Sequence, residues 1–126
     1  MKQSVIIVED AAPMTIVLEH TLTKLGLEVI ATTASGIEAV RLAEELRPDF
    51  ITLDTVLPDL LGIEVLKQIK EKNIDSKIIF ISAAGSHNLI DEAIKEGADS
   101  YLLKPLKTNE LEELINNYQV DEIIIA

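Results

Sequence analysis

Polar side chains of three kinds, carboxylate, hydroxyl and ammonium, stand directly after four short apolar runs of the chain. The runs and the residues that follow them are 5–8 with Glu9 and Asp10, 50–53 with Asp54, 78–81 with Ser82, and 101–103 with Lys104. If the runs are neighbouring parallel strands, these side chains meet at the carboxyl-end edge of one sheet, where open α/β sheets bind ligands. Several acids, one hydroxyl and one lysine at such an edge suit a divalent cation and a phosphoryl group.

The expected chemistry follows from how these charges behave together. Two carboxylates a few ångströms apart repel by ~1 kcal/mol in water and by ~4 kcal/mol in a protein-like medium. Glu9, Asp10 and Asp54 therefore stay ionised together only beside a cation. Oxygen ligands at an open site suit Mg²⁺, which keeps several waters and shares its shell with phosphate. A carboxylate between that metal and the Lys104 ammonium is a reasonable nucleophile toward phosphorus, and the product is an aspartyl phosphate.

Each of these residues, taken singly, also has an ordinary structural interpretation. An acidic residue such as Asp10 commonly caps the next helix, Ser82 could do the same, and Lys104 before Pro105 could be a surface lysine in a loop. Their joint placement favours the site, because every one follows a predicted strand and none lies inside a predicted helix.

Strand-length apolar runs alternate with segments of helical period along the chain. Strands are predicted at 5–8, 28–32, 50–53, 77–81 and 99–103. The apolar stripes of the predicted helices are Met14, Val17, Leu18, Leu22 and Leu25; Ile37, Val40 and Ala43; Ile63, Leu66 and Ile69; Ile90, Ala93 and Ile94; and Leu111, Leu114, Ile115 and Tyr118. Ser35 and Glu38 form a capping-box pattern. The alternation predicts an α/β fold with right-handed crossovers and a parallel sheet covered by helices on both faces.

Composition limits the classes of function. The 126 residues suit one domain, and 48% hydrophobic with 26% charged residues is a globular composition. The absence of cysteine excludes disulfides and thiolate metal sites. A formal charge of −11 repels phosphate backbones and anionic lipids, so neither nucleic acid nor a membrane surface is an expected partner. No apolar run has signal-peptide or membrane-spanning length, and a soluble, cytoplasmic protein is expected.

The order of these motifs resembles the receiver domain of two-component response regulators. The matching positions are Glu9 and Asp10, Leu53 and Asp54 with Pro58 and Gly62, Ser82 and Ala83, and Lys104 and Pro105. The resemblance extends from Val5 to about Tyr118, so a receiver domain is expected over 1–118, most similar to single-domain chemotaxis regulators. It implies a flavodoxin-like (βα)5 three-layer sandwich whose five-stranded parallel sheet has the order 2-1-3-4-5.

The resemblance also implies a role for each site residue. It makes Asp54 the phosphoacceptor, and Lys104 the residue that contacts the phosphoryl group. The implied ligands of Mg²⁺ are Glu9, Asp10, Asp54 and the backbone carbonyl of Thr55. Ser82 would be the hydroxyl that moves toward the phosphoryl group, and Tyr101 the aromatic switch that turns inward with it. The resemblance further implies a cis peptide between Lys104 and Pro105.

These roles describe a signalling phosphoacceptor rather than an enzyme that turns over a small substrate. A sensor histidine kinase is expected to supply the phosphoryl group of Asp54, and the domain is expected to promote its own Mg²⁺-dependent phosphorylation and dephosphorylation. No output domain is expected after Tyr118, so output is expected through a target protein that binds the surface of the fourth helix, fifth strand and fifth helix. A monomer or weak dimer is expected. Two alternatives stay open: a phosphorelay intermediate and a phosphate-independent docking module.

Two other functions are disfavoured by single positions. Phosphohydrolases with an aspartyl nucleophile usually carry a second Asp two residues later, where this chain has Val56. A flavin-binding protein would need Ser, Thr and Gly after the first strand, where the chain has the acidic segment 9–13.

Several positions depart from the commonest receiver pattern, namely Glu9, Leu57, Leu61, Val56 and Ala84. Glu9 replaces Asp and is one methylene longer, so the metal is expected to sit differently or to bind through water. Val56 and Ala84 carry no group that could orient a hydrolytic water, which suggests slow decay of the phosphorylated form; rapid spontaneous decay with Mg²⁺ would refute this hypothesis. The tail, 119–126, contains isoleucine at 123–125 and could extend the last helix, add a strand or contact a partner.

Overall fold

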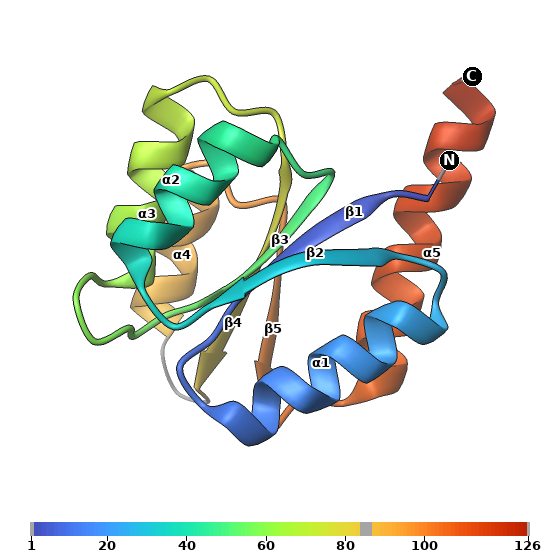
Figure 1. The fold of residues 1–126 in the computed structure, drawn as a ribbon, viewed down its shortest axis with the longest axis horizontal. Coiled ribbons are helices and arrows are strands. Elements are labelled where there is room, and N and C mark those ends of the chain that lie inside the picture. Colours follow the sequence, from blue (N-terminus) through green and yellow to red (C-terminus); the bar gives the residue numbers. More distant parts are fainter. Residues whose placement is uncertain (1, 84–86, 126) are drawn as a thin grey trace.

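The computed structural model describes residues 2–83 and 87–125, with side chains for all of these except residue 87 and residues 120–125. Strands and helices alternate along the chain (Figure 1). They are β1 Ser4–Val8, α1 Ala12–Lys24, β2 Glu28–Thr33, α2 Gly36–Leu46, β3 Phe50–Asp54, α3 Gly62–Glu71, β4 Lys77–Ala83, α4 His87–Lys95, β5 Ser100–Lys104 and α5 Thr108–Ile125. The strands pair in parallel in the order β2-β1-β3-β4-β5, which confirms the predicted topology.

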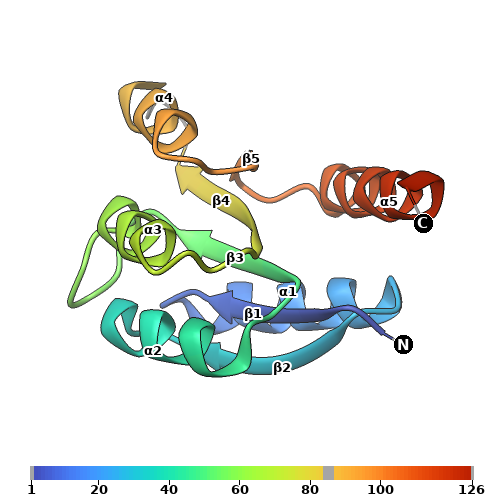
Figure 2. The same ribbon diagram turned by 90° about the horizontal axis from the view of Figure 1, so that it is seen from above.

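Helices cover both faces of the sheet, as the continuously apolar strands predict. Figures 1 and 2 show α1 and α5 on one face and α2, α3 and α4 on the other. Every residue of β3 is buried, because alternate side chains of this central strand enter two separate cores. Phe50 packs with residues of α1 and α5, and Ile51 packs with residues of α2 and α3.

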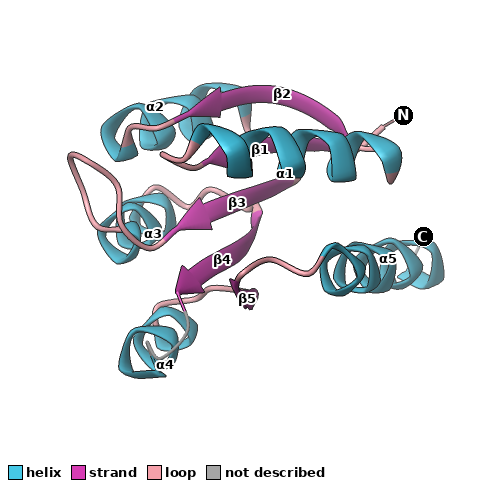
Figure 3. Ribbon diagram, turned by 90° about the horizontal axis from the view of Figure 1, so that it is seen from below, coloured by secondary structure: helices cyan, strands magenta, loops and turns pink. Residues whose placement is uncertain are grey.

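The register of the strands brings their carboxyl ends to one edge. Val8 lies beside Leu53, Asp54 lies beside Ile81, and Ala83 lies beside Lys104. The arrowheads of β1, β3 and β4 point the same way in Figure 3. The loops after these strands therefore share the edge at which the sequence predicts the site.

Some predicted core positions are wrong. Val17, Ile37 and Ile94 are 42%, 64% and 45% exposed. In α2 the predicted Val40 and Ala43 are buried together with Gly36 and Ala39, whereas Ile37 is exposed. The predicted cap is confirmed, because Ser35 Oγ accepts a hydrogen bond from the Glu38 N–H at 3.1 Å.

The backbone of residues 119–125 continues α5. Of the three alternatives for this tail, helix extension is the one that the structure has, and a partner contact stays a prediction. None of the helices within the described ranges combines the length and apolar character that a membrane crossing requires.

Candidate phosphoacceptor and metal site

Three carboxylates gather where β1 and β3 end. Asp54 is the last residue of β3, and Glu9 and Asp10 directly follow β1. One oxygen of each carboxylate lies within 4.8 Å of the others. Glu9 and Asp54 are each only 4% exposed, whereas Asp10 is exposed. The predicted acidic cluster therefore forms, with two buried members and one at the surface.

Lys104, the last residue of β5, reaches both buried carboxylates. Its ammonium donates a hydrogen bond to Asp54 Oδ1 at 3.1 Å and lies 3.4 Å from Glu9 Oε1. Burial works against the charged ammonium, but the hydrogen bond and charge of Asp54, helped by Glu9, outweigh it and raise the pKa of Lys104. One positive charge thus faces three carboxylates, and a divalent cation would compensate the remaining negative charge.

Glu9 is the incompletely satisfied member of the cluster. Its Oε2 accepts a hydrogen bond from the Ala11 N–H at 3.1 Å, but its buried Oε1 accepts none and has the Lys104 ammonium beside it at 3.4 Å as an ion pair. Burial raises the pKa of Glu9, and Asp54 raises it further against the opposing effects of Ala11 and Lys104. A buried carboxylate oxygen without a hydrogen-bond donor is a suitable ligand for a hard cation.

Gly62, the first residue of α3, packs against the backbone of Asp54 and Thr55. A Cβ at this position would lie 2.2 Å from the Asp54 carbonyl oxygen and 3.0 Å from Thr55 Cα. The Gly62 N–H donates to the Thr55 carbonyl at 2.8 Å, which leaves that oxygen a second lone pair. Glycine is required here by close approach, and the role of Thr55 as a metal ligand stays a prediction.

The proposed switch pair lies on the next two strands. Ser82 is fully buried in β4, and its Oγ donates to the Ala83 carbonyl at 3.3 Å. Tyr101 in β5 is 46% exposed, so its ring lies outward. The register pairs Phe80 with Tyr101 and Ser82 with Leu103, so the pleat places Ser82 and Tyr101 on the same face of the sheet.

Residues 5–116 match the response regulator receiver domain family. The chain belongs to this family. CheY of Thermotoga maritima, a chemotaxis protein, is 39% identical over 116 residues, which cover 92% of this chain and 97% of that protein. CheY of Bacillus subtilis is 36% identical over 116 residues, which again cover 92% of this chain and 97% of that protein.

Solved structures agree with the receiver fold. The CheX–CheY complex of Borrelia burgdorferi, which contains BeF3 and magnesium, has 30% sequence identity and a TM-score of 0.86, with 92% of this chain and 88% of that chain covered. The receiver domain of a sensor histidine kinase from Pseudomonas aeruginosa has 32% identity and a TM-score of 0.83, with 93% and 97% covered. That structure has a magnesium ion coordinated in its active-site cleft.

Other expectations for this receiver domain have mixed outcomes. The Lys104–Pro105 peptide is cis, as the resemblance implies. Val56, two residues after Asp54, is 59% exposed and offers no polar side chain. Ala84 lies outside the described residues, and slow decay of the phosphorylated form stays a prediction.

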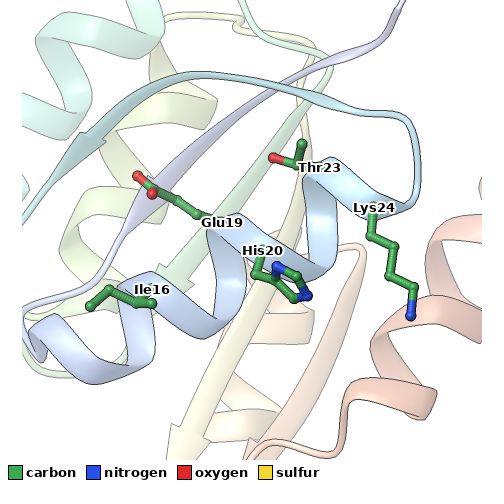
Figure 4. Close-up of a pocket in the computed structure, with 5 residues that line it drawn as sticks. All are labelled: Ile16, Glu19, His20, Thr23 and Lys24. Atoms are coloured by element: carbon green, nitrogen blue, oxygen red, sulfur yellow. The ribbon is translucent and has the colours of Figure 1, made fainter.

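Shallow cavities adjoin the acidic cluster along α1. One, of about 390 Å³, is lined by Glu9 and Asp10 and continues between α1 and the end of β2. A second, of about 440 Å³, lies over α1, where its lining residues are Ile16, Glu19, His20, Thr23 and Lys24 (Figure 4). Ile16 and Glu19 line both cavities, so this surface leads from α1 to the carboxylates.

The contact between Asp59 and the start of α2 is not predicted from the sequence. The sequence marks Asp59 only as part of a turn after Pro58, but its carboxylate bonds to the first turn of α2. The two segments are more than twenty residues apart, and no local pattern links them. Ser35 marks the start of α2 in the sequence, but this residue predicts a helix cap and not a contact with Asp59.

Proposed function

We propose that the domain is a phosphoacceptor that a histidine kinase switches by transferring a phosphoryl group to Asp54, and that it signals by protein contact. The observation that carries this proposal is the buried Asp54 carboxylate, hydrogen-bonded by Lys104 at 3.1 Å and clustered with Glu9 and Asp10. A general base two residues beyond Asp54 is absent, since Val56 stands there, which favours a switch over a turnover enzyme.

In the proposed transfer, an oxygen of Asp54 attacks the phosphorus of a phosphohistidine. A phosphorus–oxygen bond forms, the phosphorus–nitrogen bond breaks, and its electron pair leaves with the imidazole. Glu9, Asp10, Asp54 and the Thr55 carbonyl would hold Mg²⁺, which when bound offsets the carboxylate charge and screens the phosphoryl oxygens. Lys104 exchanges its hydrogen bond with Asp54 for one to the phosphoryl group.

The signal depends on a difference in contacts between two states. A phosphoryl group shifts the population only if it interacts differently with each state, and Ser82 and Lys104 would supply that difference. Tyr101, now outward, would turn inward as Ser82 moves. The target would bind the surface of α4, β5 and α5, where Ile94, Tyr101 and Leu103 are exposed. The CheX–CheY complex supports a protein target.

Intact-protein mass spectrometry tests the proposal. The chain is incubated with Mg²⁺ and a small phosphodonor such as acetyl phosphate, alongside Asp54→Ala and a chelated control. We expect one phosphoryl adduct on the wild-type chain only. No adduct on the wild type, with Mg²⁺ binding also absent, would favour a phosphate-independent docking module.

A further inference from the structure

Asp59 lies at the tip of the loop between β3 and α3, where its side chain is exposed but fully engaged. Its Oδ1 accepts a hydrogen bond from the Gly36 N–H at 2.7 Å. Its Oδ2 accepts bonds from Ser35 Oγ at 2.7 Å and from the Ile37 N–H at 3.1 Å. Asp59 and these three donors are called the Asp59 clamp below. The Ser35 hydroxyl, followed by the two backbone N–H groups, lowers the pKa of Asp59 to about 2.

On one side, the clamp is connected to the phosphoacceptor through a loop that is closed on itself. The Leu57 N–H donates to the Leu60 carbonyl at 3.2 Å, and Val56 and Leu61 form an antiparallel bridge. The loop ends at Gly62, which bonds to Thr55 and has no space for a side chain against the Asp54 carbonyl. The loop that carries Asp59 therefore contacts the backbone at Asp54 and Thr55 where it ends.

On the other side, the clamp is connected through Thr33 to the backbone of Glu9, the first of the three clustered carboxylates. The Ser35 N–H donates to Thr33 Oγ1 at 3.1 Å, and the Glu9 N–H donates to the Thr33 carbonyl at 3.0 Å. The turn from Thr33 to Ile37 thus bonds to Glu9 at one end and to Asp59 at the other. Gly36 keeps this turn close to the loop, since a Cβ there would lie 2.9 Å from Leu60 Cβ.

We infer that Asp59 is a positioning residue for the Mg²⁺-dependent phosphorylation of Asp54, holding the loops after β1, β2 and β3 in one arrangement. The expected effect on phosphorylation rests on the proposed function, in which Asp54 accepts the phosphoryl group. Asp59 touches neither the metal ligands nor the phosphoryl group, and it acts through the Thr33–Ile37 turn. Fixing the spacing of Glu9 and Asp54 in advance reduces the ordering that the cation would otherwise require.

A matched pair of variants separates positioning from general stability. Asp59→Asn is compared with Asp49→Asn, because the Asp49 carboxylate also accepts a backbone N–H and a hydroxyl, both from Ser4, but at the opposite edge of the sheet. Binding of Mg²⁺ alone is measured by calorimetry, and thermal unfolding is recorded for each protein. We expect Asp59→Asn to raise the Mg²⁺ dissociation constant about threefold, less than the roughly tenfold or more that follows loss of a direct hydrogen-bond partner of a metal ligand. Asp49→Asn should leave it unchanged.

Phosphorylation gives a second readout that a purely structural role would not produce. With Asp59→Asn, the Mg²⁺ concentration needed for half-maximal phosphorylation by acetyl phosphate should rise, while the rate at saturating Mg²⁺ stays close to that of the wild type. Equal Mg²⁺ affinities in both variants and the wild type would overturn the inference and leave Asp59 as a helix cap. If the wild type binds Mg²⁺ but takes no phosphoryl group, the proposed function fails while the affinity comparison still tests the clamp.

Discussion

The two edges of the sheet use the same kinds of side chain in opposite ways. At the amino-end edge, Asp49 accepts hydrogen bonds from the Ser4 N–H at 2.8 Å and from the Ser4 hydroxyl at 3.2 Å. The buried Ser76 hydroxyl donates to the Pro48 carbonyl at 2.6 Å. The Asp49 carboxylate and the Ser76 hydroxyl each have a backbone partner, so these groups are satisfied locally.

At the carboxyl-end edge, the carboxylates are buried together instead of being paired separately. Glu9 and Asp54 share the single ammonium of Lys104, and Glu9 Oε1 accepts no hydrogen bond. Such an arrangement costs stability unless a cation joins it, since buried charge needs compensation. The difference is that a buried carboxylate oxygen at the carboxyl-end edge lacks a hydrogen bond, whereas the carboxylate and hydroxyls described at the amino-end edge have partners.

The largest expected effect on stability comes from adding one methyl group at the carboxyl-end edge. Gly62→Ala should lower the free energy of unfolding by about 3 kcal/mol or more, because its Cβ would meet backbone that has little room to move. Denaturant titration measures this. The neighbouring Leu61→Ala, at a position 48% exposed, should change stability by less than about 1 kcal/mol. Equal effects would show that the loop does not press on Asp54.

A smaller effect of opposite sign should follow from removing one buried charge. The raised pKa of Glu9 means that this group stabilises the fold below its ordinary value of 4.5, and that this stabilisation is lost as the pH rises through the folded-state pKa. Glu9→Gln should therefore gain stability relative to the wild type between pH 4 and pH 7. The expected gain at pH 7 is on the order of 1 kcal/mol, a scale typical of charge optimisation.

Chemical denaturation at several pH values, without Mg²⁺, checks this gain. Adding Mg²⁺ should stabilise the wild type more than Glu9→Gln. A variant that is less stable than the wild type at pH 7 would contradict the interpretation that the functional edge carries excess negative charge.

The smallest effect is expected at the amino-end edge. Asp49→Asn weakens hydrogen bonds that an amide oxygen partly replaces, so it should lower the free energy of unfolding by roughly 0.5–1 kcal/mol. Stability should fall equally with and without Mg²⁺, as thermal unfolding would show. A Mg²⁺-dependent change in this variant would remove the distinction between the two edges.

Much of the functional edge follows from sequence because strand order and alternation are enough to define it. The apolar runs ending at Asp54, Ser82 and Lys104 predict parallel strands, and the strand order that the resemblance to receiver domains implies makes them neighbours whose carboxyl ends meet. The Ser35 cap is equally predictable, since its signal lies within four residues.

The remaining features depend on contacts that no local pattern contains. The Asp59 clamp joins segments over twenty residues apart, and its geometry depends on how α2 sits on the sheet. The exposure of Ile37 has the same origin, because the placement of α2 on the sheet decides which residues of its first turn face the core. The outward position of Tyr101 belongs to one state of a proposed switch, and a sequence does not select between states.

The most direct test of the contrast between the two edges is a Mg²⁺ titration followed by backbone amide NMR of the full chain. We predict saturable shifts confined to the segments around Glu9, Asp54 and Lys104, with Ser4 and Asp49 unchanged. Asp54→Asn should weaken the same shifts. Small, unsaturable shifts spread over both edges would contradict a metal-binding role for the carboxyl-end cluster.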